Sequence, residues 1–157
     1  MKKFQLVNNE NEKKKYILLQ VLPLDDEGRD FIYIYEEDHY ILFFELEKMR
    51  TKNLENQTEI PKSALGWITD TIKDGFWCKP SDGGLPKNQH AVRKEFDGED
   101  LIITRTMNAV YGEPGFALKN KSRQCYISKT SNQEVAITDS DLEDSVLDLF
   151  NQYRTDK

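Results

Sequence analysis

The sequence predicts an α+β fold built from two ββββα units, each an antiparallel sheet packed on one helix. A strand that leads directly into a capped helix stands at residues 134–153, and a similar arrangement stands seventy-seven residues earlier. Four strand-like segments precede the first helix, and four more belong to the second half. These observations together indicate the same order of four strands and one helix in both halves.

The C-terminal arrangement begins with an apolar strand at 135–137. Thr138 is suited to cap the helix that follows, because a threonine oxygen accepts a hydrogen bond from an unpaired amide of the first turn. Acidic residues in that turn favour the positive end of the helix dipole. Apolar residues at helical spacing then form one stripe, which comprises Leu142, Val146, Leu149, Phe150 and Tyr153.

The earlier arrangement spans residues 58–76. Thr58 begins the segment that leads into the helix, and Pro61 is suited to the first helical position, where no amide donor is needed. The apolar stripe comprises Ala64, Leu65, Ile68, Ile72 and Phe76. Because the match between the two arrangements is partial, we interpret it as an architectural repeat and not as a sequence duplication.

β-branched and aromatic residues predict the strands of the first half. These strands are expected at 4–7, 16–22, 31–36 and 40–47. Alternation in the third strand places Phe31, Tyr33 and Tyr35 on one face and isoleucines on the other. The polar segment 49–57 is expected to connect the fourth strand to the first helix.

The densest group of chain-breaking residues lies at 75–89 and predicts a boundary between the halves. We expect a first half at 1–77, a junction loop at 78–89 and a second half at 90–157, within one compact domain, with Trp77 buried at the seam. Strands of the second half are expected at 90–96, 100–107, 116–120 and 124–130, with a mobile contact loop at 108–115.

Composition narrows the class of protein. The chain has 157 residues, and no apolar run approaches the length of a membrane span. The N-terminus turns polar too soon for a signal peptide, and two cysteines make a disulfide framework unnecessary, so a reducing, cytoplasmic location is expected. No nucleophile–base pair, metal-ligand set or cofactor motif is recognisable, which predicts a non-enzymatic protein without a cofactor.

Charge is unevenly distributed. The net charge of −6 argues against a generally basic nucleic-acid coat protein. However, residues 101–133 contain five basic side chains and one acidic side chain, whereas residues 134–148 contain six acidic side chains and no basic one. The strands of the second half could therefore present a basic face while the last helix carries the acidic charge.

The two helix-entry segments are NQTEIPKSAL at 56–65 and NQEVAITDSDL at 132–142. A ββββα unit used twice, with these polar entries, resembles the PUR-alpha and Whirly families of single-stranded nucleic-acid binders, at the level of topology. The resemblance implies a protein that binds single-stranded DNA or RNA on a basic and aromatic sheet face. Phosphates would meet Lys119, Lys121, Arg123 and Lys129, Arg105 would meet a phosphate or a base, and bases would stack on Tyr126, Phe31, Tyr33 and Tyr35.

Alternative interpretations remain for each of these groups. The aromatic row on 31–35 could form a second core layer, and the basic residues could be solvated edge protection. The second function considered is a protein-interaction module, such as an immunity, inhibitor or adaptor protein, that binds a basic partner through its acidic helices or a sheet edge. The sequence also leaves open whether the halves pack within one chain or through a homo-oligomer.

Overall fold

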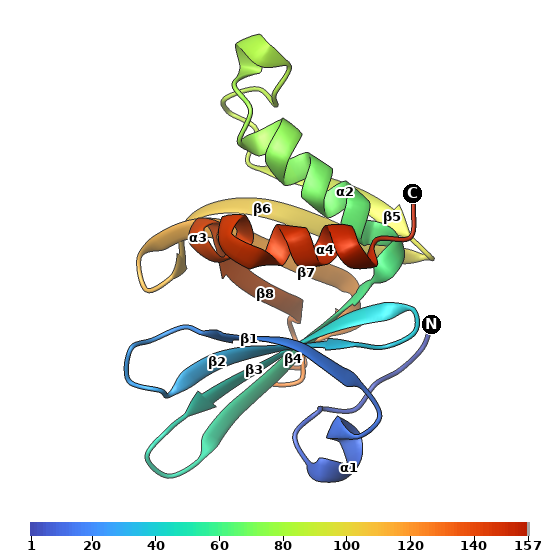
Figure 1. The fold of residues 1–157 in the computed structure, drawn as a ribbon, viewed down its shortest axis with the longest axis vertical. Coiled ribbons are helices and arrows are strands. Elements are labelled where there is room, and N and C mark those ends of the chain that lie inside the picture. The colour runs from blue at the N-terminus through green and yellow to red at the C-terminus, as the bar shows by residue number, and fades with distance from the viewer. Residues whose placement is uncertain (157) are drawn as a thin grey trace. The chain divides into compact units, whose positions relative to one another are not determined.

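A computed structural model describes residues 1–156 and has two four-stranded antiparallel sheets with helices, as the predicted α+β class requires (Figure 1). The first sheet has the order β1-β2-β3-β4, and the second has the order β5-β6-β7-β8. Neighbours in each sheet are consecutive in the sequence, so both sheets are meanders. Within each sheet, a short local connection therefore joins each strand to the next.

The strands of the first sheet are β1 (Ile17–Pro23), β2 (Asp30–Glu36), β3 (Tyr40–Lys48) and β4 (Asn53–Pro61). Ile32 and Ile34 of β2 are fully buried on one face, as their alternation predicts. The opposite face is aromatic, because Tyr33 lies opposite Phe44 in the β2–β3 ladder. Strand β4 begins in the segment 49–57, which was expected to be a polar connection, and continues through 58–61, which was expected to lead into the helix. Residues 4–7, which were expected to be a strand, are irregular.

The strands of the second sheet are β5 (Ala91–Phe96), β6 (Glu99–Val110), β7 (Glu113–Gln124) and β8 (Asn132–Thr138). Asp97 and Gly98, with φ of 52° and 80°, form the expected hairpin turn between β5 and β6. The expected contact loop at 108–115 is wrong, since β6 and β7 extend through it to a tight turn at Tyr111 and Gly112. The strand expected at 124–130 is also wrong, because β7 ends at Gln124 and residues 125–131 connect it to β8.

The first long helix consists of the 3-10 turn η1 (Lys62–Ala64), α2 (Leu65–Asp70) and the π-helical segment η2 (Thr71–Phe76). Its predicted stripe is buried from Ala64 to Ile72. Thr58 does not cap this helix, because it is a fully buried residue of β4, and Pro61 precedes the first turn. A short helix, α1 (Glu10–Lys13), lies near the N-terminus.

The second long helix consists of α3 (Asp139–Asp141), the π-helical segment η4 (Leu142–Val146) and α4 (Leu147–Tyr153). The predicted cap is confirmed, since Thr138 Oγ1 accepts a hydrogen bond of 3.1 Å from the amide of Asp141. Helix α4 packs against α2. Among residues 1–156, no helix combines the length and apolar character that crossing a bilayer requires.

Two compact units emerge from the contacts within the chain. Unit 1 comprises Met1–Ile60 and Lys119–Val135, and unit 2 comprises Pro61–Leu118 and Ala136–Lys157. This division differs from the expected halves at 1–77 and 90–157 in two ways. The first long helix belongs to unit 2, and residues 119–135, which include the end of β7, most of β8 and their connection, belong to unit 1 with the first sheet. Whether those halves behave as domains stays a prediction.

Candidate functional site

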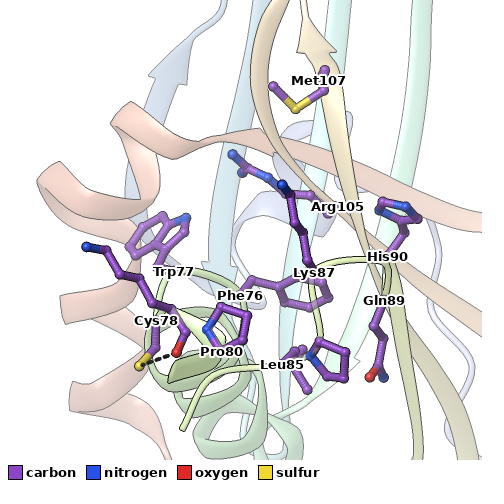
Figure 2. A pocket seen from close by; sticks show the side chains of 12 residues that line it. Phe76, Trp77, Cys78, Pro80, Leu85, Lys87, Gln89, His90, Arg105 and Met107 are labelled. Atoms are coloured by element: carbon purple, nitrogen blue, oxygen red, sulfur yellow. Dashed lines mark hydrogen bonds between the residues drawn. The ribbon is translucent and has the colours of Figure 1, made fainter. Parts of the chain in front are cut away.

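Unit 2 contains a cavity of about 380 Å³ on the loop that follows the first long helix (Figure 2). Aromatic, basic and apolar side chains form its wall. The lining residues are Phe76, Trp77, Cys78, Lys79, Pro80, Leu85, Pro86, Lys87, Gln89, His90, Arg105 and Met107. None of these lining residues, all of which lie in the described part of the chain, is acidic. A cavity with this wall favours a ligand that has both negative charge and a flat apolar surface.

Phe116 of β7 supports three parts of the wall from behind. It is fully buried, and its ring centroid lies 5.1 Å from that of Phe76 and 6.2 Å from that of Trp77. The Arg105 guanidinium carbon stands 4.8 Å from the same centroid. Because one buried ring contacts all three side chains, the aromatic and cationic parts of the wall are held together.

Asp139, at the start of the second long helix, connects Arg105 to Trp77. Its Oδ1 accepts a hydrogen bond of 2.6 Å from Arg105 Nη1 and one of 3.3 Å from Trp77 Nε1. Arg105 Nη1 also donates to the carbonyl of Gly115 at 3.3 Å. The Arg105 side chain remains 25% exposed and is one of the residues that line the cavity. Its charge is partly balanced by Asp139, which leaves the lysines as the main cationic groups.

Local backbone chemistry fixes the loop that carries most of this wall. The amide of Leu85 donates a hydrogen bond of 2.9 Å to the carbonyl of Gly75, and the amide of Arg105 donates one of 2.8 Å to the carbonyl of His90. Gly84 lies so close to the loop's own backbone that a Cβ atom would stand 1.9 Å from the Cys78 carbonyl oxygen. A larger residue cannot occupy that position without moving the loop.

Two lysines, Lys79 and Lys87, are exposed at this cavity, as is His90. Figure 2 shows Trp77 and His90 on opposite sides, with Lys87 and Arg105 pointing into the space between them. An exposed lysine attracts a phosphate without losing an existing buried contact. The arrangement can therefore bind an anion beside an aromatic ring.

The predicted aromatic row lies on the first sheet, in unit 1, and is partly covered. Val7 is fully buried in a cluster with Tyr35 and neighbouring residues of β3, so the N-terminal segment lies over that end of the face. Tyr35 is only 4% exposed, and its assignment to base stacking is incompatible with this burial. Phe31 and Tyr33 are half-buried, and Tyr33 lines a smaller cavity of about 240 Å³.

Arg123, a predicted phosphate ligand, is instead a buried residue of unit 1. Its Nη1 lies 3.4 Å from Glu59 Oε1, with side-chain exposures of 4% for the arginine and 1% for the glutamate. The guanidinium also stands over the rings of Phe4 and Tyr40, at 5.4 and 4.9 Å. A phosphate could reach Arg123 only if these contacts were broken, because a phosphate contact requires an accessible guanidinium.

Glu59 is the centre of a buried polar network that sequence analysis missed. Gln133 Nε2 donates to its Oε1 at 2.9 Å, and Gln57 Nε2 donates to its Oε2 at 3.1 Å. Burial raises the pKa of Glu59, while the glutamine hydrogen bonds and the charge of Arg123 oppose that shift. Both glutamines belong to the helix-entry segments, but nothing in one sequence indicates that they converge on one carboxylate.

The remaining predicted residues are dispersed. Tyr126 lies in the connection between β7 and β8, where its hydroxyl donates to the Phe4 carbonyl at 2.8 Å and burial raises the pKa of the phenol. Lys121 and Lys129 are exposed and Lys119 is half-buried, all in unit 1. Of the nine predicted site residues, only Arg105 belongs to the cavity of unit 2.

Sequence analysis missed the other cavity residues because most of them lie at 78–89, which was interpreted as a junction loop. Two lysines and a histidine close to an aromatic pair, with a single acid at Asp82, were the available signal.

Within residues 1–156, no group of three or more His, Cys, Asp or Glu side chains is arranged to hold a metal ion. Comparisons with protein-family models, curated proteins and solved structures give no match.

Proposed function

We propose that this protein binds single-stranded nucleic acid at the cavity of unit 2. The observation that carries the proposal is the wall of that cavity, in which Trp77 and Phe76 adjoin Lys79, Lys87 and Arg105 without a lining carboxylate. Single-stranded nucleic acid exposes phosphate charges and unpaired base faces, so its binders combine spaced cations with aromatic rings. The wall offers both kinds of group.

Each part of the wall has a distinct role in this proposal. Lys79 and Lys87 contact phosphates, since both are exposed and lie on the loop. A base stacks against Trp77, which is held by Phe116 and by the hydrogen bond to Asp139. Arg105, positioned by Asp139, contacts the same nucleotide through its side chain, which lines the cavity. Stacking on one ring contributes about 1–3 kcal/mol per base.

The overall charge of −6 opposes binding of a polyanion at long range. Affinity is therefore expected to be modest and to depend strongly on ionic strength, because the local cations must outweigh the acidic surface elsewhere. In this proposal the wall recognises phosphate charge and the faces of the bases. DNA and RNA share both features, so either is compatible with the site.

The test is fluorescence anisotropy of a labelled mixed-sequence single-stranded oligonucleotide over a series of salt concentrations. The double variant Lys79→Ala/Lys87→Ala should weaken binding and reduce the slope of log K against log salt by about 1.4, or about 0.7 for each lost phosphate contact. Trp77→Leu should weaken binding and leave that slope unchanged, because it removes a ring and no charge.

The matched control is Lys119→Ala/Lys121→Ala, which removes the same charge from the predicted basic face in unit 1. This control should bind with the wild-type slope. If the control lowers the slope and the Lys79/Lys87 variant does not, the site lies in unit 1. If the wild-type protein binds no oligonucleotide even at low ionic strength, the proposal is wrong.

A protein-interaction module remains the second candidate. The second long helix exposes Glu143, Asp144 and Asp148 along its length, which would suit a basic protein partner. This candidate predicts that triple substitution of these acids by serine abolishes partner binding and leaves oligonucleotide binding intact or stronger. The nucleic-acid proposal predicts no loss of oligonucleotide binding from that variant either, so the lysine variants decide between the two.

A further inference from the structure

Strand β1 forms one edge of the first sheet and is unusually apolar. It pairs with β2 and stands at the end of the sheet order. Its sequence, ILLQVLP, has no charged residue, whereas the other edge strand, β4, contains Glu55 and Glu59. Soluble proteins ordinarily protect a sheet edge with charged side chains, because an edge without them can pair with another strand.

Side chains of β1 are exposed on both of its faces. Leu18 and Val21 are 48% and 38% exposed and lie beside Tyr35 and Tyr33 in the ladder, so they extend the aromatic face. Ile17 is 63% exposed, beside Glu36. A register shift between Leu18 and Gln20 adds local twist, so a further strand would make a short ladder in which these side chains supply much of the contact.

Opposite charges flank the two ends of β1. Lys13, Lys14 and Lys15 precede the strand, and Asp25, Asp26 and Glu27 follow it. Some of this charge is paired locally, since Lys13 and Lys15 lie 3.8 and 3.0 Å from Glu10 and Glu12, and Arg29 pairs with Asp25 and Glu27. Each group of three nevertheless keeps its sign, and Lys14 and Asp26 are both exposed.

This pattern of charge is complementary to itself in one orientation only. Gln20 is the middle residue of β1, and Lys14 and Asp26 each lie six positions from it, as Lys13 and Glu27 each lie seven positions from it. Lys13 ends α1 and Lys14 caps it, so the lysines stand beside the start of β1 and do not extend the strand. When two copies of β1 run antiparallel about a two-fold axis near Gln20, the basic flank of each copy therefore comes to the end of the strand where the other copy carries its acids. A parallel arrangement would place like charges together.

We infer that β1 is the interface through which two copies of this chain form a dimer, with the two first sheets joined edge to edge across antiparallel β1 strands. We assign a second copy of the chain to this edge, because β1 carries both the apolar side chains and the opposite flanking charges that another β1 strand would pair with. The dimer does not depend on the nucleic-acid site, which lies in unit 2.

The experiment exchanges charges at the two flanks and measures mass by sedimentation equilibrium at low and high salt. The double variant Lys13→Glu/Lys14→Glu is acidic at both flanks, and Asp26→Lys/Glu27→Lys is basic at both flanks. Each variant alone should dimerise at least about tenfold more weakly than the wild type, because both flanks then repel. An equimolar mixture of the two should recover the dimer, and high salt should weaken that recovery.

Two controls keep the result independent of folding. The double variant Lys119→Glu/Lys121→Glu makes the same charge change outside the first sheet and should dimerise like the wild type. Leu18→Lys should abolish the dimer while circular dichroism shows an unchanged fold. A wild-type chain that stays monomeric at high micromolar concentration overturns the inference. So does a dimer that tolerates Leu18→Lys, or a pair of charge variants that fails to form a mixed dimer.

Discussion

Arg105 and Asp139 are 34 positions apart in the sequence and are joined by a hydrogen bond of 2.6 Å between Nη1 and Oδ1. The same carboxylate oxygen accepts from Trp77 Nε1, so one acid orients a cation and an aromatic ring of the same cavity. Both members of the pair are about one-quarter exposed. A charge-assisted bond at this depth positions its donor without the cost of full burial.

Asp139→Asn should therefore lower the free energy of unfolding by about 1 kcal/mol, because a neutral amide accepts more weakly from the guanidinium and no longer places a negative charge at the positive end of the helix dipole. Urea denaturation followed by circular dichroism measures the change. Ser140→Ala is the matched control, since Ser140 is the next residue of the same turn and is exposed. An equal loss in both variants would mean that the helix start, and not the Arg105 contact, is responsible.

Trp77 should report ligand binding by its own emission. The chain has two tryptophans, and Trp67 packs in α2 with its ring centroid 5.3 Å from that of Phe96. In a Trp67→Phe variant, addition of the oligonucleotide should quench the remaining emission, because a stacked base contacts the indole. In the Trp77→Phe variant, the emission of Trp67 should not change. Quenching in the second variant alone would place the ligand outside the cavity.

The predictable parts of the fold are those governed by local periodicity. The buried stripes of both long helices, the Thr138 cap and the turn at Asp97 and Gly98 depend on residues within a few positions of one another. Strand β4 was missed because its polar first half, which includes Gln57, was expected to be a connection, and its second half, which includes Glu59, was expected to lead into the helix. Partners distant in the sequence satisfy both side chains when buried: Gln57 bonds to the backbone of Gln5 and Val7, and the amide and carboxylate of Glu59 meet Gln133, 74 positions away.

The cavity was not predicted because it, too, is formed by residues that are far apart in the sequence. Its wall combines a loop with Arg105 of β6, and the buried support comes from Phe116 of β7. Glycines and prolines in that loop were read as a boundary between halves, although Gly84 serves the close packing of the loop on itself. Chain-breaking residues thus identify a loop, but they do not distinguish a linker from the wall of a site.

The buried pair of Arg123 and Glu59 should be important for stability. Arg123→Met leaves the carboxylate without its cation and should lower the free energy of unfolding by about 3 kcal/mol or more. Adding Glu59→Gln should restore part of that loss, because the unpaired charge is then removed. Lys121→Met is the control, since Lys121 is exposed and two positions away, and it should change stability by less than about 0.5 kcal/mol. Equal effects of the two single variants would contradict the structural role of Arg123.

Glu45 of β3 should make stability fall as the pH rises through neutrality. Burial, and then the charges of Asp30, Glu134 and Glu47, raise the pKa of Glu45 to about 7 in the folded protein, against an ordinary value of 4.5. Between these values the folded state holds a proton that the unfolded state has released, so the free energy of unfolding decreases with pH in this window. Above pH 7 the ionised carboxylate costs about 2 kcal/mol after allowance for its partial exposure.

Glu45→Gln removes this titration and serves as the measurement. The difference in free energy of unfolding between Glu45→Gln and the wild type should grow in favour of the variant from pH 5 to pH 8, when both are denatured with urea in matched buffers. Glu95→Gln is the matched control, since Glu95 is an exposed glutamate of β5 and is not among the charges that act on Glu45, and its difference should stay nearly constant. A difference for Glu45→Gln that is flat across this range would show that the Glu45 carboxyl is ionised throughout it in the folded protein.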